Sequence, residues 1–154
     1  MLAIRPDSWN LPLLVHVASA MLLVAAVTVA SVALIQALRT PDTSAAVSLQ
    51  RFGSRTLLYV AIPSSILLNI DAEWIKSREF SSSAADPAWI GWGYGTAEGS
   101  LVFLIIAAVL SGLALRRSRT GAGLGNFSRA ATVLTLLALA VLVIAVWAMT
   151  TKPM

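Results

Sequence analysis

The sequence predicts an all-α integral membrane protein, a four-transmembrane-helix bundle with both termini on the outer side. Composition is the first reason: 58% of the 154 residues are hydrophobic and 12% are charged, against about 45–50% and about 25% in soluble domains. The second is that long apolar segments alternate with loops that contain most of the arginines. A water-soluble fold of this size could not bury so much apolar surface, so lipid is the predicted solvent.

The first predicted helix spans residues 11–38, which include no formal charge. At about 1.5 Å per residue it is longer than the ~30 Å hydrocarbon core, and a tilt would absorb the excess. Residues 18–20 resemble a signal-peptidase site, but the apolar run continues well beyond them. We therefore expect an uncleaved helix that ends near Pro41.

The second predicted helix, residues 51–71, is the least apolar of the four. Its charge-free part, residues 56–70, is short for a span, so the helix should extend back through Arg51 and Arg55. The long arginine side chains can reach the lipid headgroups. Pro63 should kink this helix and free a backbone carbonyl about one turn earlier.

The third predicted helix spans residues 87–115 and the fourth spans residues 130–149. An Asp-Pro pair at 86–87 is typical of a helix start. Aromatic residues in the first turns of the third helix are typical of a membrane interface. Between these helices, residues 120–128 are rich in glycine and predict a flexible turn.

The positions of the basic residues predict the orientation of the chain. Seven of them lie in the first and third loops or at their edges: Arg39, Arg51, Arg55, Arg116, Arg117, Arg119 and Arg129. The opposite side has Arg5, Lys76, Arg78 and Lys152. Cytoplasmic loops are enriched in Lys and Arg, so the arginine-rich loops are predicted to be cytoplasmic.

The same arginines bracket apolar segments instead of clustering on a soluble face, so the predicted partner is the lipid bilayer and not nucleic acid. Arginine far outnumbers lysine in a chain rich in alanine, valine and leucine. That bias suggests a bacterial protein. The predicted location is therefore the bacterial plasma membrane, with several passes.

Small residues predict where the helices pack, because helices in lipid associate through close packing more than through hydrophobicity. On the first helix they share one face: Ser19, Ala26, Ala30, Ala33 and Ala37. On the third helix the pattern is Gly91, Gly95 and Gly99. These glycines would contact another helix of the bundle or a second subunit, or they belong to a loosely wound entry to the helix.

Two ionisable residues inside predicted helices are functional candidates, because such groups are costly in a membrane without a partner. His16, the only histidine, continues the small-residue face; the alternative is a neutral, hydrogen-bonded histidine. Glu98 lies about 16 Å into the third helix, unless the embedded part begins later and leaves it at the headgroups. Asn69, Asp71 and Glu73 share the outer half with them. The five could line one cavity, although separate interface residues are the preferred interpretation.

No enzyme is predicted. The chain has no cysteine, which excludes disulfides, thiolate metal sites and cysteine nucleophiles. Phosphate-binding glycine loops and the HExxH zinc motif are absent from the sequence. One histidine cannot supply two axial haem ligands within one chain. No cofactor is therefore expected, and haem or copper at His16 is left as an alternative.

Four short motifs spread over the chain form a family pattern: His16-Val17 in the first helix, Arg51-Phe52 before the second, Pro63 within it, and Met149-Thr150-Thr151-Lys152-Pro153 at the end. With them the sequence resembles small uncharacterised bacterial membrane proteins related in pattern to the copper-resistance protein D group. The resemblance implies a four-helix membrane protein, with copper or haem handling in some members. The chain departs from a soft-metal pathway in having one histidine and only Met21 and Met149 within helices.

The leading hypothesis is a non-enzymatic packing subunit of a homo-oligomer or of a larger membrane complex. Four short helices leave little room for a substrate cavity, and the glycine pattern offers a contact face. The alternative is a small transporter or an ion- or proton-conducting protein that uses Glu98 and His16. A second alternative is a haem- or copper-binding membrane protein with His16 as a ligand.

Overall fold

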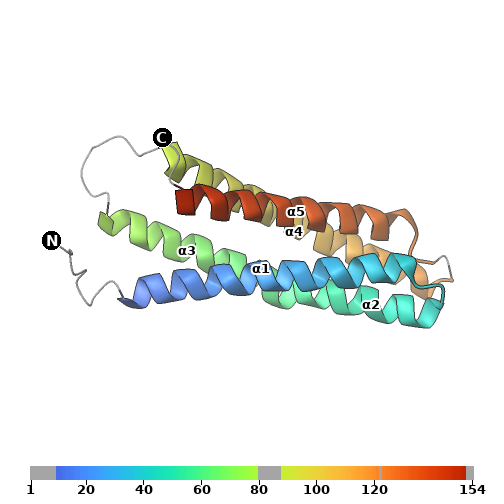
Figure 1. Ribbon diagram of the computed structural model, residues 1–154. Coiled ribbons are helices and arrows are strands. Elements are labelled where there is room, and N and C mark those ends of the chain that lie inside the picture. The colour runs from blue at the N-terminus through green and yellow to red at the C-terminus, as the bar shows by residue number, and fades with distance from the viewer. Residues whose placement is uncertain (1–9, 80–87, 122, 152–154) are drawn as a thin grey trace.

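The computed structural model describes residues 10–79, 88–121 and 123–151, which are helical almost throughout. In chain order the elements are α1 (Asn10–Arg39), α2 (Thr43–Thr56), the π-helical η2 (Leu57–Ala61), α3 (Ile62–Glu79), α4 (Ala88–Arg119) and α5 (Gly125–Thr151). Because α2, η2 and α3 follow one another without a break, they form one long rod. Successive rods run in alternating directions, so α1 begins and α5 ends at the same end of the bundle (Figure 1).

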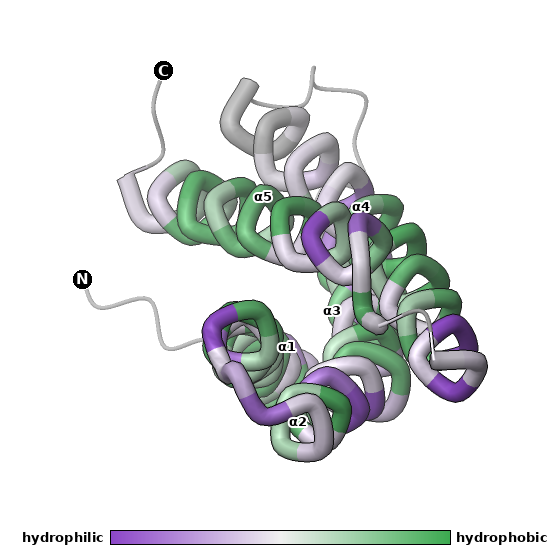
Figure 2. Tube along the Cα trace, turned by 90° about the vertical axis from the view of Figure 1, so that its right-hand side faces the viewer, coloured by the Kyte–Doolittle hydropathy of each residue, from purple (hydrophilic) through white to green (hydrophobic). Residues whose placement is uncertain are grey.

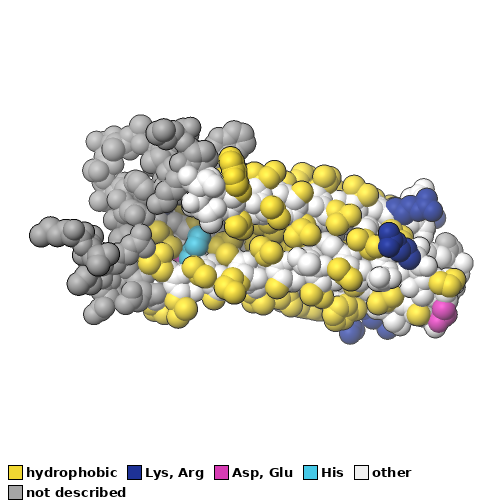
Figure 3. Space-filling view, in the orientation of Figure 1, with side chains coloured by type: hydrophobic (Ala, Val, Ile, Leu, Met, Phe, Trp, Pro, Cys, Tyr) yellow, Lys and Arg dark blue, Asp and Glu magenta, His cyan; other side chains and the backbone are white. Residues whose placement is uncertain are grey.

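The two ends of the bundle differ in charge. We call one the arginine end, because α1 and α4 stop there and α5 begins there, with Arg39, Arg116, Arg117, Arg119 and Arg129. Figure 3 shows its dark blue side chains at one end of the molecule. The opposite end, near the start of α1, contains His16 and is called the histidine end.

Among the described residues, three helices are long and apolar enough to cross a membrane: Leu11–Arg39, Gly93–Arg119 and Gly125–Thr151. The all-α fold is confirmed, and three helices among the described residues, not the predicted four, have the length and hydropathy of a membrane span. The rod from α2 to α3 does not reach the same mean hydropathy. Between the two ends the surface is largely apolar (Figure 3), with Leu14 66% and Val143 58% exposed. Such a surface is compatible with contact to lipid.

The second rod begins earlier and ends later than the predicted residues 51–71. Asp42 is the N-cap of α2, and its carboxylate accepts hydrogen bonds from the backbone N–H of Ser44 at 3.0 Å and from its hydroxyl. The bond from the Ser44 N–H, followed by that from the hydroxyl, holds the pKa of Asp42 below its ordinary value. This cap satisfies a donor that a helix start leaves open. The helix therefore begins at Thr43.

The irregularity predicted before Pro63 takes the form of a wide turn. The backbone N–H of Ile62 donates to the carbonyl of Leu57, five residues earlier, which is the π-helical pattern of η2. Proline lacks an N–H, so a wider turn directly before it accommodates the missing bond. The wide turn also sets the rotation of α3 about its axis, and with it the direction in which Asp71 points.

The last two helices are longer than predicted. α4 continues to Arg119 instead of ending at residue 115, and α5 starts at Gly125 instead of residue 130. The flexible turn predicted over residues 120–128 is therefore too long. Within the shorter connection Gly121 and Gly123 have φ angles of 82° and 67°, a conformation that favours glycine. The predicted helix start at residues 86–87 lies outside the described residues.

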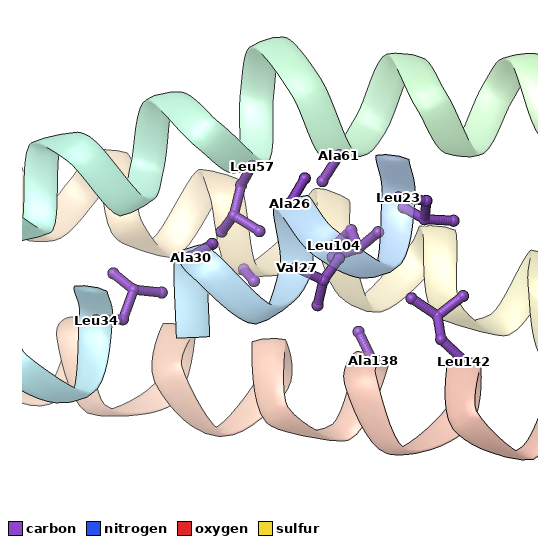
Figure 4. Close-up of a cluster of buried hydrophobic side chains, with 11 residues drawn as sticks. Leu23, Ala26, Val27, Ala30, Leu34, Leu57, Ala61, Leu104, Ala138 and Leu142 are labelled. Carbon is purple, nitrogen blue, oxygen red and sulfur yellow. The ribbon is translucent and has the colours of Figure 1, made fainter. Parts of the chain in front are cut away.

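The core of the bundle lies where α1 meets the rod, α4 and α5. Figure 4 shows this cluster of buried side chains: Leu23, Ala26, Val27, Ala30, Leu34, Leu57, Ala61, Leu104, Ala107, Ala138 and Leu142. The five small residues of the α1 face, Ser19, Ala26, Ala30, Ala33 and Ala37, are all buried. α1 packs against α2, α3 and α5. Small side chains on this face permit the close approach.

α1 and α2 approach each other closely at Gly53, a glycine that the sequence pattern did not single out. A Cβ atom at Gly53 would lie 3.0 Å from the Cγ of Leu34 and 3.4 Å from the carbonyl oxygen of Ala30. Contacts that short are rare for real side chains. Glycine at this position therefore allows the two helices to touch.

The glycine face of α4 contacts no described helix of the same chain. A Cβ atom at Gly91, Gly95 or Gly99 would meet no heavy atom within 4 Å, and α4 is already helical there. The entry to α4 is therefore regular helix from Ala88 onward, and contact of the glycines with another helix or with a second subunit stays a prediction. Gly93 is the buried α4 glycine, and a Cβ there would overlap the side chain of Met149 on α5.

Candidate functional site

The only histidine faces a buried carboxylate across the interface between α1 and α3. The Nδ1 atom of His16 lies 3.4 Å from the Oδ2 atom of Asp71, and the two side chains are 28% and 3% exposed. Among the described residues neither atom has a hydrogen-bond partner of good geometry. The structure thus brings together two of the candidate residues that the sequence analysis treated separately.

The chemistry of this pair follows from burial. A carboxylate removed from water needs a cation or a proton, and the His16 imidazole is positioned to supply either. If Nδ1 carries the proton shared with Asp71, Nε2 of the neutral ring is a hydrogen-bond acceptor. Binding of a second proton turns Nε2 into a donor and makes the pair neutral overall. The site can therefore change both charge and hydrogen bonding.

A pocket of about 660 Å³ lies beside the pair, between α1, α3, α4 and α5. Its lining is almost entirely apolar, with His16, Asn69 and Thr150 among the few polar side chains. α1 and α5, two of the helices that line it, are neighbours in the bundle (Figure 2). In Figure 3 His16, the cyan side chain, lies at the edge of the hollow between these helices.

The apolar core closes the pocket toward the arginine end. Leu23 and Leu142 line the pocket and also belong to the core cluster. Beyond them Val27, Leu104 and Ala138 are fully buried. Packed side chains thus fill the bundle between the pocket and the arginine end, while the exposed side chains of Val17, Met21 and Val146 form its rim between α1 and α5.

The other predicted polar residues have separate positions. Asn69 lines the pocket, and its side-chain amide donates to the carbonyl of Ser65 at 2.9 Å. Glu98 is exposed. Its neighbour Ala97 lines the pocket, and one residue along a helix turns the side chain by about 100°. Glu73 is exposed as well. The structure pairs His16 with Asp71 and does not place Glu98 beside it.

The described residues offer few metal ligands. No group of three or more His, Asp or Glu side chains that could hold a metal ion occurs among them. The pair of His16 and Asp71 provides two ligands at most. Met21 and Met149 line the same pocket as His16, and haem or copper binding at His16 stays a prediction.

A second buried polar cluster, near the arginine end, was missed by the sequence analysis. The side-chain amide of Gln50 donates to the hydroxyl of Ser111 at 2.7 Å, and its carbonyl oxygen accepts from the hydroxyl of Ser128 at 2.7 Å. All three side chains are fully buried. Gln50 precedes the predicted helix 51–71, so it was assigned to a loop. Because these bonds link α2, α4 and α5, the cluster has a structural role.

Comparison with known proteins gives no match to a family model, a curated protein or a solved structure. The resemblance to proteins of the copper-resistance protein D pattern stays a prediction. Function has to be inferred from the pair and the pocket themselves.

Proposed function

We propose that the protein is a small, non-enzymatic, proton-coupled carrier of the bacterial plasma membrane, with His16 and Asp71 as its proton-binding site. One observation supports this most: the imidazole, 3.4 Å from the buried carboxylate, lines a pocket that packed side chains close toward the arginine end. A carrier needs such one-sided access, and an ionisable pair within the membrane is typical of proton pathways. Asp71 takes the role that the sequence analysis gave to Glu98.

The proposal includes a fourth span and an orientation. The rod Thr43–Glu79 has a length of roughly 55 Å at 1.5 Å per residue, more than the ~30 Å hydrocarbon core. On α3 the apolar side chains of Ile66 and Ile70 are exposed, while Ser65 and Asp71 are buried. That distribution suits a helix between lipid and bundle. The arginine end would be cytoplasmic by the positive-inside rule, with both termini outside.

The carrier proposal is tested by proton flux in liposomes under an imposed pH gradient, with a hydrophobic amine, alcohol or carboxylate supplied in turn as the counter-substrate and an enclosed pH-sensitive dye as the reporter. We expect Asp71→Asn and His16→Gln to reduce the flux to that of empty liposomes. Each variant removes one ionisable partner of the pair, so the pair can no longer bind and release a proton as the native one does. Glu98→Gln is the matched control and should retain the flux, since Glu98 is exposed and outside the pocket lining. Native-like circular dichroism of each variant shows that the fold persists.

The outcomes separate the alternatives. Wild-type flux equal to that of empty liposomes with every counter-substrate would contradict a carrier. Flux that persists in Asp71→Asn but disappears in Glu98→Gln would move the proton site to α4. Loss in both variants would show that the exposed carboxylate also takes part.

A second candidate function, a packing subunit of a homo-oligomer, is supported by the open glycine face of α4. Glycines at close spacing allow helix backbones to touch in lipid, and a Cβ at Gly91, Gly95 or Gly99 meets nothing within the chain. We expect Gly95→Leu to lower the oligomer fraction in native mass spectra from mild detergent by about tenfold, roughly 1.4 kcal/mol. Ala140→Leu, at an exposed position of α5, should leave it unchanged. An equal oligomer fraction in both variants would contradict a role of the glycine face in oligomer formation.

A further inference from the structure

We infer that the pocket beside His16 binds a hydrophobic ammonium, that is, a protonated amine with an apolar body, which competes with a proton for the Nε2 atom of His16. The inference rests on the proposed proton site and names its substrate class. It follows from three features of the pocket: its lining, its mouth and its charge.

The lining requires an apolar body. About 660 Å³ enclosed mainly by aliphatic side chains and one tyrosine, Tyr94, lies within the range of pockets for small organic ligands. Polar ligands would lose their hydration there without replacement. Asn69, one of the few polar lining residues, already donates its amide to Ser65. The ligand must therefore be mostly hydrocarbon.

The mouth of the pocket indicates entry from the membrane. Val17 and Met21 on α1 and Val146 on α5 line the pocket, yet they are 53%, 69% and 49% exposed. Side chains that are exposed and apolar at once form a rim that faces lipid in the proposed orientation. A molecule dissolved in the bilayer can pass between α1 and α5 without crossing a polar barrier.

The charge of the site selects the head group. Nδ1 of His16 faces Asp71 and the residue lines the pocket, from which we infer that Nε2 is the ring nitrogen that faces the pocket. With one shared proton the pair has a net charge of about −1, and with two it is neutral. A buried negative charge favours a cation, and an ammonium N–H can donate to the neutral Nε2. A carboxylate head group would meet repulsion from Asp71, because the pair does not become positive.

The other charged groups on the surrounding helices do not change the charge assigned to the pair of His16 and Asp71. On α3, Glu73 is exposed and Lys76 lies 5.3 Å from the centre of the Tyr94 ring. On α4, Glu98 is exposed. The described parts of α1 and α5 have no charged side chain at the histidine end other than His16. Asp71 is therefore the carboxylate that sets the charge at Nε2.

A hydroxyl head group would not couple to protons in the same way. A hydroxyl can donate to the neutral Nε2 and accept from the protonated one, so it binds both states. An ammonium only donates, and it is repelled by an imidazolium. Binding of the ammonium thus releases the Nε2 proton to the outer solution, and binding of a proton expels the ammonium, which is what exchange of the two across a membrane requires.

The test uses the single histidine as a reporter. With ¹⁵N-labelled histidine, the ring nitrogens of His16 in the full-length protein give signals without overlap, because the chain has one histidine. Spectra at about pH 5 and about pH 8, on both sides of the ordinary histidine value of about 6.5, show whether the ring changes its protonation. Octylammonium, octanol and octanoate are then added separately at each pH.

We expect octylammonium to shift the Nε2 signal at high pH. Its affinity should fall by about tenfold for each unit by which the pH is lowered, once the ring is protonated. Octanol should bind with little pH dependence, and octanoate least well. Ala145→Phe, which fills the pocket, should abolish the shift. Ala140→Phe, at an exposed site on the same helix, should leave it intact.

The result separates the two proposals. A ring that keeps one protonation state at both pH values contradicts the proton site itself. A ring that titrates but does not respond to octylammonium, or responds equally in Ala145→Phe, overturns only the substrate assignment. Stronger binding of octanoate than of octylammonium would show that the site selects anions.

Discussion

Gly53→Leu is expected to destabilise the bundle by about 3 kcal/mol or more, the upper end of the effects of overpacking a core. Even the Cβ atom would lie 3.0 Å from the Leu34 side chain and 3.4 Å from the carbonyl oxygen of Ala30. Leu34 is fully buried, so it has no space into which it can move. The rest of the leucine side chain would force α1 and α2 apart.

The matched control is Gly112→Leu on α4, outside the glycine face, where the same atoms enter open space. There the gain in helix propensity, about 0.8–1.0 kcal/mol from glycine to a good helix former, is not opposed by contacts within the chain. Thermal unfolding in mild detergent, followed by circular dichroism, should show a large loss of Tm for Gly53→Leu and none for Gly112→Leu. Equal stability of the two variants would mean that α1 and α2 do not pack closely at Gly53.

The parts of the fold that the sequence predicts well depend on strong local patterns. The long charge-free run of α1 and the spacing of Ala26, Ala30 and Ala33 predict both a span and its buried face. All three alanines are buried. Helical periodicity alone fixes which residues share a face, so this prediction needs no knowledge of the partner helix.

The ends of the helices could not be predicted in the same way. Apolar runs mark the part of a helix that suits lipid, whereas the helix itself continues until a cap or a glycine stops it. Asp42 starts α2 by accepting from the Ser44 N–H, and Gly125 begins α5 with a positive φ. Because α2 begins before the predicted residue 51, Gln50 was placed in a loop instead of in the core.

The sequence predicts at which end of the bundle the candidate site lies, but not which residues form it. Topology placed His16, Asp71 and Glu98 in the same half of the bundle, but it could not tell which of them face one another. That depends on the rotation of each helix, and in α3 the rotation is affected by the π-helical turn before Pro63. Glu98 is one position from the pocket residue Ala97 and is exposed. Such a difference is beyond the resolution of sequence patterns.

Gln50→Leu is the second change expected to have a large effect, a loss of about 2–3 kcal/mol of stability. The leucine side chain is of similar volume, so the change isolates the two hydrogen bonds to Ser111 and Ser128. Each bond contributes about 0.5–1.5 kcal/mol, closer to 0.6 kcal/mol between helices in lipid. The larger part comes from burying serine hydroxyls without their partner, at about 1–3 kcal/mol for a group left unsatisfied.

Gln36→Leu is the control, since Gln36 is the other glutamine of the chain and is exposed near the arginine end. Unfolding by increasing SDS in mixed micelles should show a lower midpoint for Gln50→Leu and an unchanged midpoint for Gln36→Leu. The triple variant Gln50→Leu, Ser111→Ala, Ser128→Ala should recover part of the loss, because it removes the unsatisfied hydroxyls. If the triple variant is less stable than Gln50→Leu alone, the serines contribute through other contacts, and the three groups do not act as one cluster that joins α2, α4 and α5.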